Sequence, residues 1–278
     1  MLVTLKQILQ IAEANECAVG SFNTPNLASI RAVISAAEEV GMPVIIMHAQ
    51  IHEEMGVCKM DEMAPIMVLM AEKAKVPVCV HLDHGTDLYY INKALKLGFT
   101  SVMYDGSELD PKRNYANTCT AVELASKYGI SVEAEIGSMG ARESGAAGIS
   151  NESIYTDPDA AKFFADNTGI DALACAFGTA HGLYLKEPKL DFDRLRKIHE
   201  IVDIPIVMHG GSGVSHDDYR KVIKLGVRKI NYYTYMAQAG GNAVKEANEL
   251  TFYHDIELAA IEGMKKDAMS AIKVFSNK

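Results

Sequence analysis

Short apolar runs rich in β-branched residues alternate along the chain with longer segments of helical periodicity. The runs are nearly continuous rather than alternating, which is typical of strands buried on both faces of a parallel sheet. They cover residues 18–22, 43–47, 77–82, 100–104, 131–136, 171–177, 204–208 and 228–232. We therefore predict eight strands.

Between these runs, apolar residues recur three and four positions apart, as on the buried face of an amphipathic helix. Such segments include residues 27–40, 60–74, 114–128, 191–201 and 217–225. A glycine often precedes the next strand, at the point where a left-handed residue commonly ends a helix. These glycines are Gly41, Gly98, Gly129, Gly169 and Gly226. The pattern therefore predicts eight units of strand and helix around a parallel sheet.

Eight such units in 278 residues fit a closed barrel better than an open doubly wound sheet. The first predicted strand is not followed by G-x-G-x-x-G, the dinucleotide fingerprint that would favour the open sheet. No linker or low-complexity tract divides the chain. We predict an α/β protein with a single (β/α)8 TIM barrel over residues 1–278, including a helical C-terminal extension.

Composition narrows the classes of partner and location. The formal net charge of −9 disfavours nucleic acid, because a polyanion would be repelled. No apolar run approaches the roughly 20 residues that a membrane-spanning helix needs. The N-terminal segment lacks the features of a secretory signal, so we expect a cytoplasmic protein. The five cysteines are scattered without C-x-x-C spacing, which predicts neither disulfides nor a thiolate metal site.

Barrel enzymes carry their catalytic residues at the C-terminal ends of the strands. Three predicted strands end at His84, His181 and His209, each followed by glycine. One such histidine alone would be interpreted as structural, but three at equivalent strand ends can converge over the barrel axis. Three neutral imidazoles with one open position make a catalytic Zn²⁺ site, which we predict here. We interpret the other histidines considered as structural or surface residues: His48, His52, His199, His216 and His254.

Carboxylates accompany these histidines. Asp83 directly precedes His84 and could take a proton from a substrate hydroxyl near the metal, so it is the predicted general base. The same position would suit an acceptor for the second N–H of a metal-bound histidine, and this alternative stays open. Asp105 and Glu135 end neighbouring strands and are interpreted as orienting acceptors or as part of an alternative metal position.

A glycine-rich turn, His209-Gly-Gly-Ser-Gly213, precedes an amphipathic helical segment. Backbone N–H groups in such a turn can approach an oxyanion closely. The region after the seventh strand of a barrel is also its usual phosphate site. With Gly182, Asn231 and Thr234 expected nearby, the turn is predicted to bind a phosphate group.

Together these motifs resemble those of the class II, metal-dependent ketose-bisphosphate aldolases, the fructose- and tagatose-bisphosphate enzymes, over nearly the whole chain. The matching motifs are His81-Leu-Asp-His-Gly85, Val132-Glu-Ala-Glu-Ile-Gly137, Gly-x-x-His-Gly around His181, His209-Gly-Gly-Ser-Gly213, and Lys229-Ile-Asn231 with Thr234. The resemblance implies a lyase that cleaves or forms the C3–C4 bond of a phosphorylated ketose, giving dihydroxyacetone phosphate and an aldehyde. It also suggests a homodimer or a homotetramer.

The resemblance implies roles for individual residues. Zinc would bind the three histidines, Asp83 would deprotonate the C4 hydroxyl, and Glu143 would be the acid that protonates the enediolate. The family binds phosphate, often with a monovalent cation (Na⁺ or K⁺), at positions that match Gly182, Gly210, Gly211, Ser212, Asn231 and Thr234.

Departures from the family pattern concern the substrate. Ala49 stands where the family usually has Ser, and Leu185 where it has Lys. Tyr233 replaces a small or acidic residue, and residues 251–255 lack the family's Pro-Arg pair. We interpret Ala49 and Tyr233 as specificity positions and expect the distal half of the substrate to differ.

Other functions stay open. One is an aldolase for a different ketose 1-phosphate, such as an inositol-degradation or sulfosugar intermediate. A zinc barrel hydrolase would instead activate water and predicts no phosphate loop, and a non-catalytic relative would only bind a sugar phosphate. A Schiff-base aldolase needs a desolvated lysine inside the barrel, whereas Lys229, flanked by Arg228, is expected to face outward.

Overall fold

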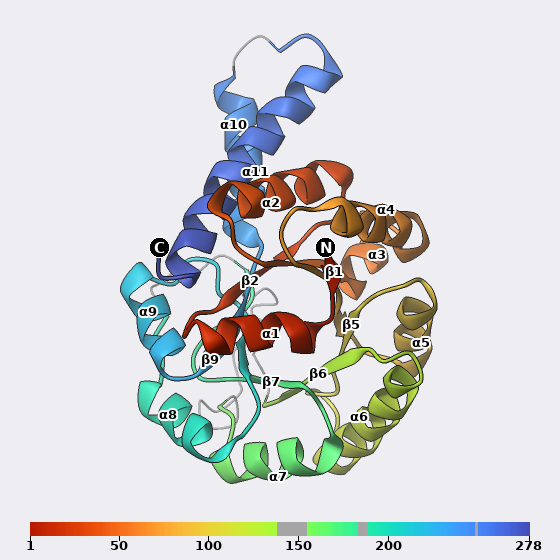
Figure 1. Ribbon diagram of the computed structural model, residues 1–278, viewed down its shortest axis with the longest axis vertical. Coiled ribbons are helices and arrows are strands. Elements are labelled where there is room, and N and C mark those ends of the chain that lie inside the picture. The colour runs from red at the N-terminus through yellow and green to blue at the C-terminus, as the bar shows by residue number, and fades with distance from the viewer. Residues whose placement is uncertain (138–154, 183–187, 248–249) are drawn as a thin grey trace.

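A barrel of parallel strands, surrounded by helices, forms the body of the computed structural model (Figure 1). The structure describes residues 1–137, 155–182, 188–247 and 250–278. The barrel strands are β2 (Val19–Asn23), β3 (Val44–Ala49), β4 (Val78–Gly85), β5 (Ser101–Tyr104), β6 (Ser131–Ile136), β7 (Ala172–Cys175), β8 (Ile206–Met208) and β9 (Val227–Tyr232). All eight predicted strands are therefore confirmed.

The strands pair in chain order from β2 to β9, and β9 pairs with β2 to close the barrel. Every pairing is parallel, and almost every strand residue is buried because helices cover the outer face. A further short strand, β1 (Leu2–Val3), pairs with the beginning of β4. The predicted (β/α)8 TIM barrel is thus confirmed.

Helices follow the strands around the barrel. They are α1 (Leu5–Ala14), α2 (Leu27–Val40), α3 (Gln50–Glu54), α4 (Met60–Lys73), α5 (Leu88–Lys96), α6 (Pro111–Ser126), α7 (Pro158–Thr168), α8 (Phe192–Ile201), α9 (His216–Lys224), α10 (Thr234–Glu246) and α11 (Tyr253–Phe275). Side chains such as Asn26 and Asp157 cap helices by accepting a backbone N–H of the first turn. The five glycines predicted at helix ends all adopt positive φ.

Helix α1 lies across the N-terminal end of the barrel (Figure 1). Its buried face, which includes Leu5, Ile8 and Leu9, belongs to the same apolar cluster as Ile45 and Val207 from the strands. This apolar cluster fills the N-terminal end of the barrel. The C-terminal end is therefore the one at which polar, catalytic side chains can gather.

Helices α10 and α11 pack against each other, and α11 also packs along α2. Their outer ends extend from one side of the barrel (Figure 1). Near the barrel, the ring of Phe275 contacts Tyr219 and Tyr232 edge to face, which ties the end of α11 to β9 and α9. Among the described helices, none has both the length and the apolar character to cross a membrane.

Candidate active site

The three predicted metal ligands meet at the C-terminal end of the barrel. One ring nitrogen of each of His84, His181 and His209 lies within 4.8 Å of the others. His84 has a left-handed backbone, with a φ of 49°, where the pairing of β4 with β5 shifts register. A non-glycine residue in this conformation is strained, and such strain is often found at functional sites. Here it occurs at the residue whose ring contacts both of the other imidazoles.

Carboxylates fix two of the rings. His84 Nδ1 lies 2.6 Å from Asp105 Oδ2, and His209 Nε2 lies 2.8 Å from Glu133 Oε1. The remaining nitrogens, His84 Nε2 and His209 Nδ1, face each other at 3.1 Å. An acceptor on the outer nitrogen fixes the ring and leaves the inner lone pair for a metal. Asp105 and Glu133 thus occupy the positions of orienting acceptors.

A fourth group supports a cation at this point. Glu135 is 2% exposed, its Oε2 lies 3.5 Å from His209 Nδ1, and this oxygen has no hydrogen-bond donor among the described residues. Burial, together with the nearby charge of Asp105, raises the pKa of Glu135 well above its usual value. Burial disfavours a charged His84, but Asp83 and Asp105 outweigh it and raise the pKa of His84 to about 10. The residues present therefore fit a divalent cation.

Asp83 lies next to this cluster but does not orient a histidine. Its carboxylate accepts hydrogen bonds from Asn23 Nδ2 at 2.9 Å and Asn231 Nδ2 at 3.1 Å, and Oδ1 is 4.0 Å from His84 Nε2. Burial opposes its ionisation, yet His84, His209 and Lys229 hold the pKa of Asp83 below its usual value. The carboxylate is therefore ionised and free to accept a proton, as the general-base interpretation requires.

The expectation that Lys229 faces outward is wrong. Its side chain is fully buried inside the barrel, and Nζ lies 2.9 Å from Glu133 Oε2 and 2.7 Å from Asn231 Oδ1. Arg228 takes the outward position, where it pairs with Glu13. Since the strand alternates sides, one of the two adjacent cations had to enter the barrel.

Sequence reasoning missed two orienting residues in this region. Asn23 ends β2 and holds one oxygen of Asp83. Glu133 links the Lys229 ammonium to His209. The sequence offers a signal for Glu133: it belongs to the motif Val132-Glu-Ala-Glu-Ile-Gly137 and lies two residues before Glu135 on the same strand. Asn23 offered only its position at a strand end.

The glycine turn lies beside the histidines, as predicted. Ser212 is 4% exposed and its Oγ accepts the Tyr233 N–H at 3.0 Å, while the Gly211 N–H donates to Asn231 O. Thr234 is the first residue of α10, so the open N–H groups of that helix also face this turn. The Asn231 amide turns toward Asp83 and Lys229 rather than the turn, which makes it a link between the two halves of the site.

Gly210 brings β7 and β8 into close approach. A Cβ at this position would lie 2.4 Å from Ala180 O, and the φ of Gly210 is +61°. Ala180 belongs to the turn that carries His181 and the half-buried Gly182. A side chain at Gly210 would therefore push that turn, and the His181 ligand, away from the site.

We expect Gly210→Ala to lower catalytic activity and to destabilise the fold by about 2–3 kcal/mol, combining backbone strain with the clash. Gly41→Ala is the matched control, because Gly41 also has positive φ (+70°) but a Cβ there would meet nothing within 4 Å. Its cost should stay near 1 kcal/mol, with activity unchanged. Urea unfolding and steady-state kinetics of both variants measure this. Equal losses in the two would contradict the close-approach argument.

The structure also places the two residues that we predict to determine specificity. Ala49 is the last residue of β3 and pairs with Asp83 across the sheet. Tyr233 follows β9 and is half-buried. The predicted acid Glu143 and the substituted position Leu185 lie outside the described residues.

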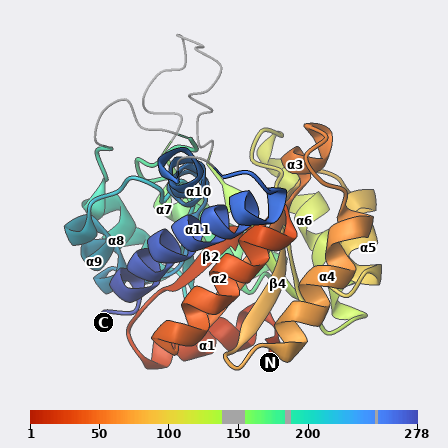
Figure 2. The ribbon, with the colours of Figure 1, turned by 90° about the horizontal axis from the view of Figure 1, so that it is seen from above.

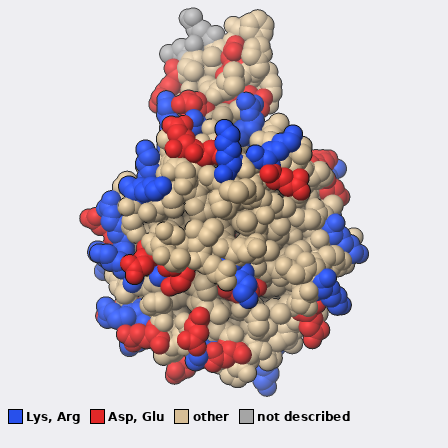
Figure 3. All heavy atoms as spheres, viewed as in Figure 1, with Lys and Arg blue, Asp and Glu red and all other residues tan. Residues whose placement is uncertain are grey.

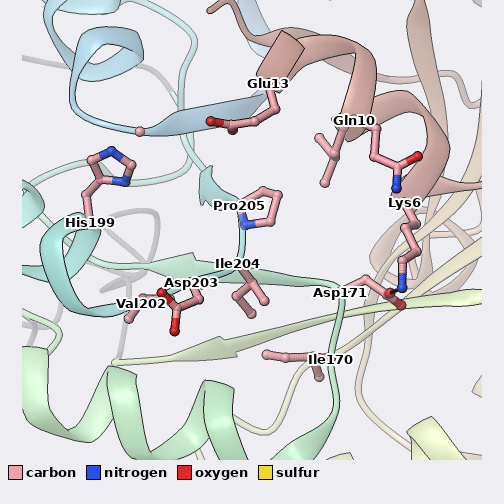
Figure 4. Close-up of a pocket in the computed structure, with 12 residues that line it drawn as sticks. Lys6, Gln10, Glu13, Ile170, Asp171, His199, Val202, Asp203, Ile204 and Pro205 are labelled. Atoms are coloured by element: carbon pink, nitrogen blue, oxygen red, sulfur yellow. Dashed lines mark ion pairs between the residues drawn. The ribbon is translucent and has the colours of Figure 1, made fainter.

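A pocket of about 490 Å³ lies at the opposite end of the barrel, lined from α1 and from the segments before β7, β8 and β9 (Figure 4). Its charged lining includes Lys6 and Asp171, which form an ion pair at 3.4 Å, together with Glu13 and Asp203. Acidic and basic side chains are interspersed over this face (Figure 3). The pocket is far from the histidine cluster, so we do not assign the chemistry to it.

Comparisons with known proteins agree with this geometry. A family model described as "Fructose-bisphosphate aldolase class-II" matches residues 3–278. The Escherichia coli (strain K12) protein named "Uncharacterized protein YdjI" is 38% identical over 280 residues, 100% of this chain and 98% of its own length. The Bacillus subtilis (strain 168) protein named "Probable fructose-bisphosphate aldolase" is 40% identical over 247 residues, 88% of this chain and 86% of its own.

A solved structure extends the likeness to three dimensions. The crystal structure of the YdjI aldolase from Escherichia coli K12 matches with a TM-score of 0.89 and 37% identity, over 99% of this chain and 97% of that one. The barrel, the histidine cluster and the family match over nearly the whole length point to the same assignment. The chain belongs to the class II fructose-bisphosphate aldolase family.

Proposed function

We propose that the protein is a zinc-dependent aldolase that cleaves or forms the C3–C4 bond of a phosphorylated ketose, giving dihydroxyacetone phosphate and an aldehyde. The observation that carries the proposal is the convergence of His84, His181 and His209 beside the ionised Asp83 at the open end of the barrel. Its substrate is a phosphorylated ketose, either of the fructose- or tagatose-bisphosphate type or with a different distal end.

In cleavage, Asp83 takes the proton of the C4 hydroxyl, and the C4–O bond becomes the carbonyl of the released aldehyde. The electrons of the broken bond pass to C3 of the dihydroxyacetone phosphate fragment, which then gains a proton there from Glu143. A zinc ion held by the three histidines would supply Lewis-acid stabilisation of the negative charge on that fragment. Asn23 and Asn231 hold Asp83 so that its free lone pairs face the reacting hydroxyl.

The phosphate end would bind at the glycine turn. Gly211 and Ser212 lie beside the N-terminal turn of α10, where Thr234 begins the helix. Helix N-termini attract phosphate because their first N–H groups lack intrahelical partners. Gly182 and Gly210 would lie on the same side of the bound phosphate, and a Na⁺ or K⁺ ion would offset the phosphate charge.

The alternatives fare differently. Lys229 lies inside the barrel, but its ammonium donates to Glu133 and Asn231 and is not free to attack a carbonyl, which disfavours Schiff-base chemistry. Family membership disfavours a zinc hydrolase. A different ketose 1-phosphate within the same family remains the second candidate, favoured by Tyr233 at the pocket wall. The cytoplasmic location and the homodimeric or homotetrameric state stay predictions of the sequence.

Metal removal tests the proposal directly. We expect a chelator to reduce retro-aldol cleavage of ketose 1-phosphates and 1,6-bisphosphates to background, because the three-histidine site then lacks its Lewis acid. Added Zn²⁺ should restore the rate. Cleavage is followed by enzymatic reduction of dihydroxyacetone phosphate, and metal content by elemental analysis. Full turnover in protein shown to be metal-free would overturn the proposal.

A further inference from the structure

The mouth of the barrel has a wall built from α3 and the beginning of α10. Because Ala49 pairs with Asp83, helix α3 begins directly beside the predicted general base. Figure 2 shows α3 at the end of the barrel opposite α1, the end that carries the histidine cluster. The residue of α3 that turns inward is His52, which is 7% exposed.

His52 meets Tyr233 across the end of β2. Their ring centroids are 5.0 Å apart at an angle of 59°. The Tyr233 N–H donates to Ser212 Oγ, so the residue that forms this wall is also joined to the phosphate turn. Tyr233 therefore sets the distance between the phosphate end of a bound substrate and the wall formed by α3 and the beginning of α10.

One nitrogen of the His52 ring, Nδ1, is buried without a hydrogen-bond partner among the described residues. Leaving a buried polar atom unpaired is costly, so such atoms in native proteins usually bind a ligand or water. Burial lowers the pKa of His52, with Asp83 opposing, so the imidazole is neutral and can both donate and accept.

Neighbouring contacts hold α3 in place. Glu53 accepts the Met60 N–H at 2.8 Å and the Tyr90 hydroxyl at 2.7 Å, and it pairs with Lys93 at 3.6 Å. His52 O accepts the Val57 N–H at 2.8 Å. The short helix is thereby tied to α4 and α5, so the His52 ring is pre-positioned rather than free to move away from a ligand.

The lysine side chains around this wall are already paired with carboxylates and are therefore poorly suited to bind a phosphate group. Lys93 lies between Glu53 and Asp61, and Lys59 pairs with Glu62 at 3.7 Å. Lys59, just before α4, and Lys93, on α5, are thus both matched by carboxylates. Where side chains bind a phosphate group, they do so through guanidinium or ammonium groups that are not already paired with carboxylates.

We propose that His52 and Tyr233 contact the part of the substrate beyond the cleaved bond and select an uncharged, hydroxylated end over a phosphorylated one. The inference rests on the proposed aldolase function and adds its substrate class. His52 Nδ1 exchanges a hydrogen bond with a distal hydroxyl, and the Tyr233 ring packs against the carbon chain. Ala49, by its small size, leaves room for that chain beside Asp83.

The test uses the condensation direction with dihydroxyacetone phosphate and a set of aldehydes: both enantiomers of glyceraldehyde, and D-glyceraldehyde 3-phosphate. We expect the unaltered protein to prefer a glyceraldehyde over the phosphorylated aldehyde. His52→Leu should lower kcat/KM for glyceraldehyde about tenfold, mainly through KM, as expected for one lost hydrogen bond to a buried group. His52→Gln, which keeps a polar atom, should recover part of this loss. Tyr233→Ala should shift the preference toward the phosphorylated aldehyde.

Solvent proton exchange of dihydroxyacetone phosphate alone is the internal control, because it involves only the other half of the substrate. It should be unchanged in the His52 variants and in His254→Leu, a change at an exposed histidine. Equal losses in exchange and condensation, unchanged aldehyde preference, or an unaltered protein that prefers the phosphorylated aldehyde would each overturn the inference. Absence of both exchange and condensation in the unaltered zinc-loaded protein would instead refute the aldolase function itself.

Discussion

Replacing Asp83 by Asn is expected to lower the rate of carbon–carbon cleavage by about 10³-fold, within the range typical of a lost general base. The change removes the ionised oxygen but keeps the shape of the side chain. Asp83 accepts from Asn23 and Asn231 rather than from a ring N–H of the predicted metal ligands. Because Asp105 and Glu133 orient those rings, the substitution should leave zinc bound.

Three measurements separate this role from a structural one. Elemental analysis should find unchanged zinc, and kcat for cleavage should fall far more than KM rises. Proton exchange of dihydroxyacetone phosphate should persist, since the proton at C3 is handled by a different residue. Asp110→Asn is the matched control, because Asp110 caps α6 and Asn caps helices equally well. Retained cleavage, or loss of zinc, in the Asp83 variant would refute the general-base assignment.

The barrel could be predicted from the sequence because buried parallel strands leave an unambiguous pattern. Runs such as residues 77–82 are apolar on both faces, and polar residues gather where the runs end. The strand-end rule then brought His84, His181 and His209 together without any knowledge of distances. For the barrel strands and the histidines at their ends, the local sequence pattern therefore agrees with the fold.

Other parts of the site could not be predicted because the pattern allowed two answers. Arg228 and Lys229 are adjacent on β9, and alternation alone does not say which cation faces inward. The answer depends on partners distant in sequence: Glu13 on α1 for Arg228, and Glu133 on β6 for Lys229.

The role proposed for His52 could not be predicted from the sequence, for a related reason. The five-residue helix α3 is too short to show helical periodicity. Its buried side is defined by Tyr233, which follows β9, and β2 separates β9 from the strand β3 that precedes α3. Residues that contact each other only through barrel closure leave no local signal.

Lys229→Met is expected to destabilise the protein by about 3–5 kcal/mol, the usual cost of leaving a buried charge without its partner. Lys229 and Glu133 are both fully buried, and Nζ lies 2.9 Å from Oε2. Urea unfolding measures the change. Lys162→Met is the control: Lys162 pairs with Asp166 and Asp203 at the surface, where solvent screens the ion pairs, so its loss should cost far less than that of Lys229.

The pH dependence of this destabilisation identifies its cause. Burial opposes ionisation of Glu133, yet Lys229 and the bond from His209 lower the pKa of Glu133 to about 2. A lowered carboxyl pKa gives stability that is present above the unfolded pKa and is lost as the pH falls toward 2. Without Lys229 the pKa of Glu133 should rise above its unfolded value, so lowering the pH from 7 to about 5 should stabilise the variant. The difference from the unaltered protein should therefore shrink.

Activity should fall together with stability, because Lys229 joins the two halves of the site. It holds Glu133, which orients His209, and Asn231, which holds Asp83. In the double variant Lys229→Met/Glu133→Gln, removal of the unpaired charge should recover much of the stability but little of the activity, since a neutral amide is a weaker acceptor for His209, and Asn231 lacks the Lys229 ammonium. Recovery of both would mean that Lys229 serves only to neutralise Glu133. Recovery of neither would mean that its contribution lies in packing rather than charge.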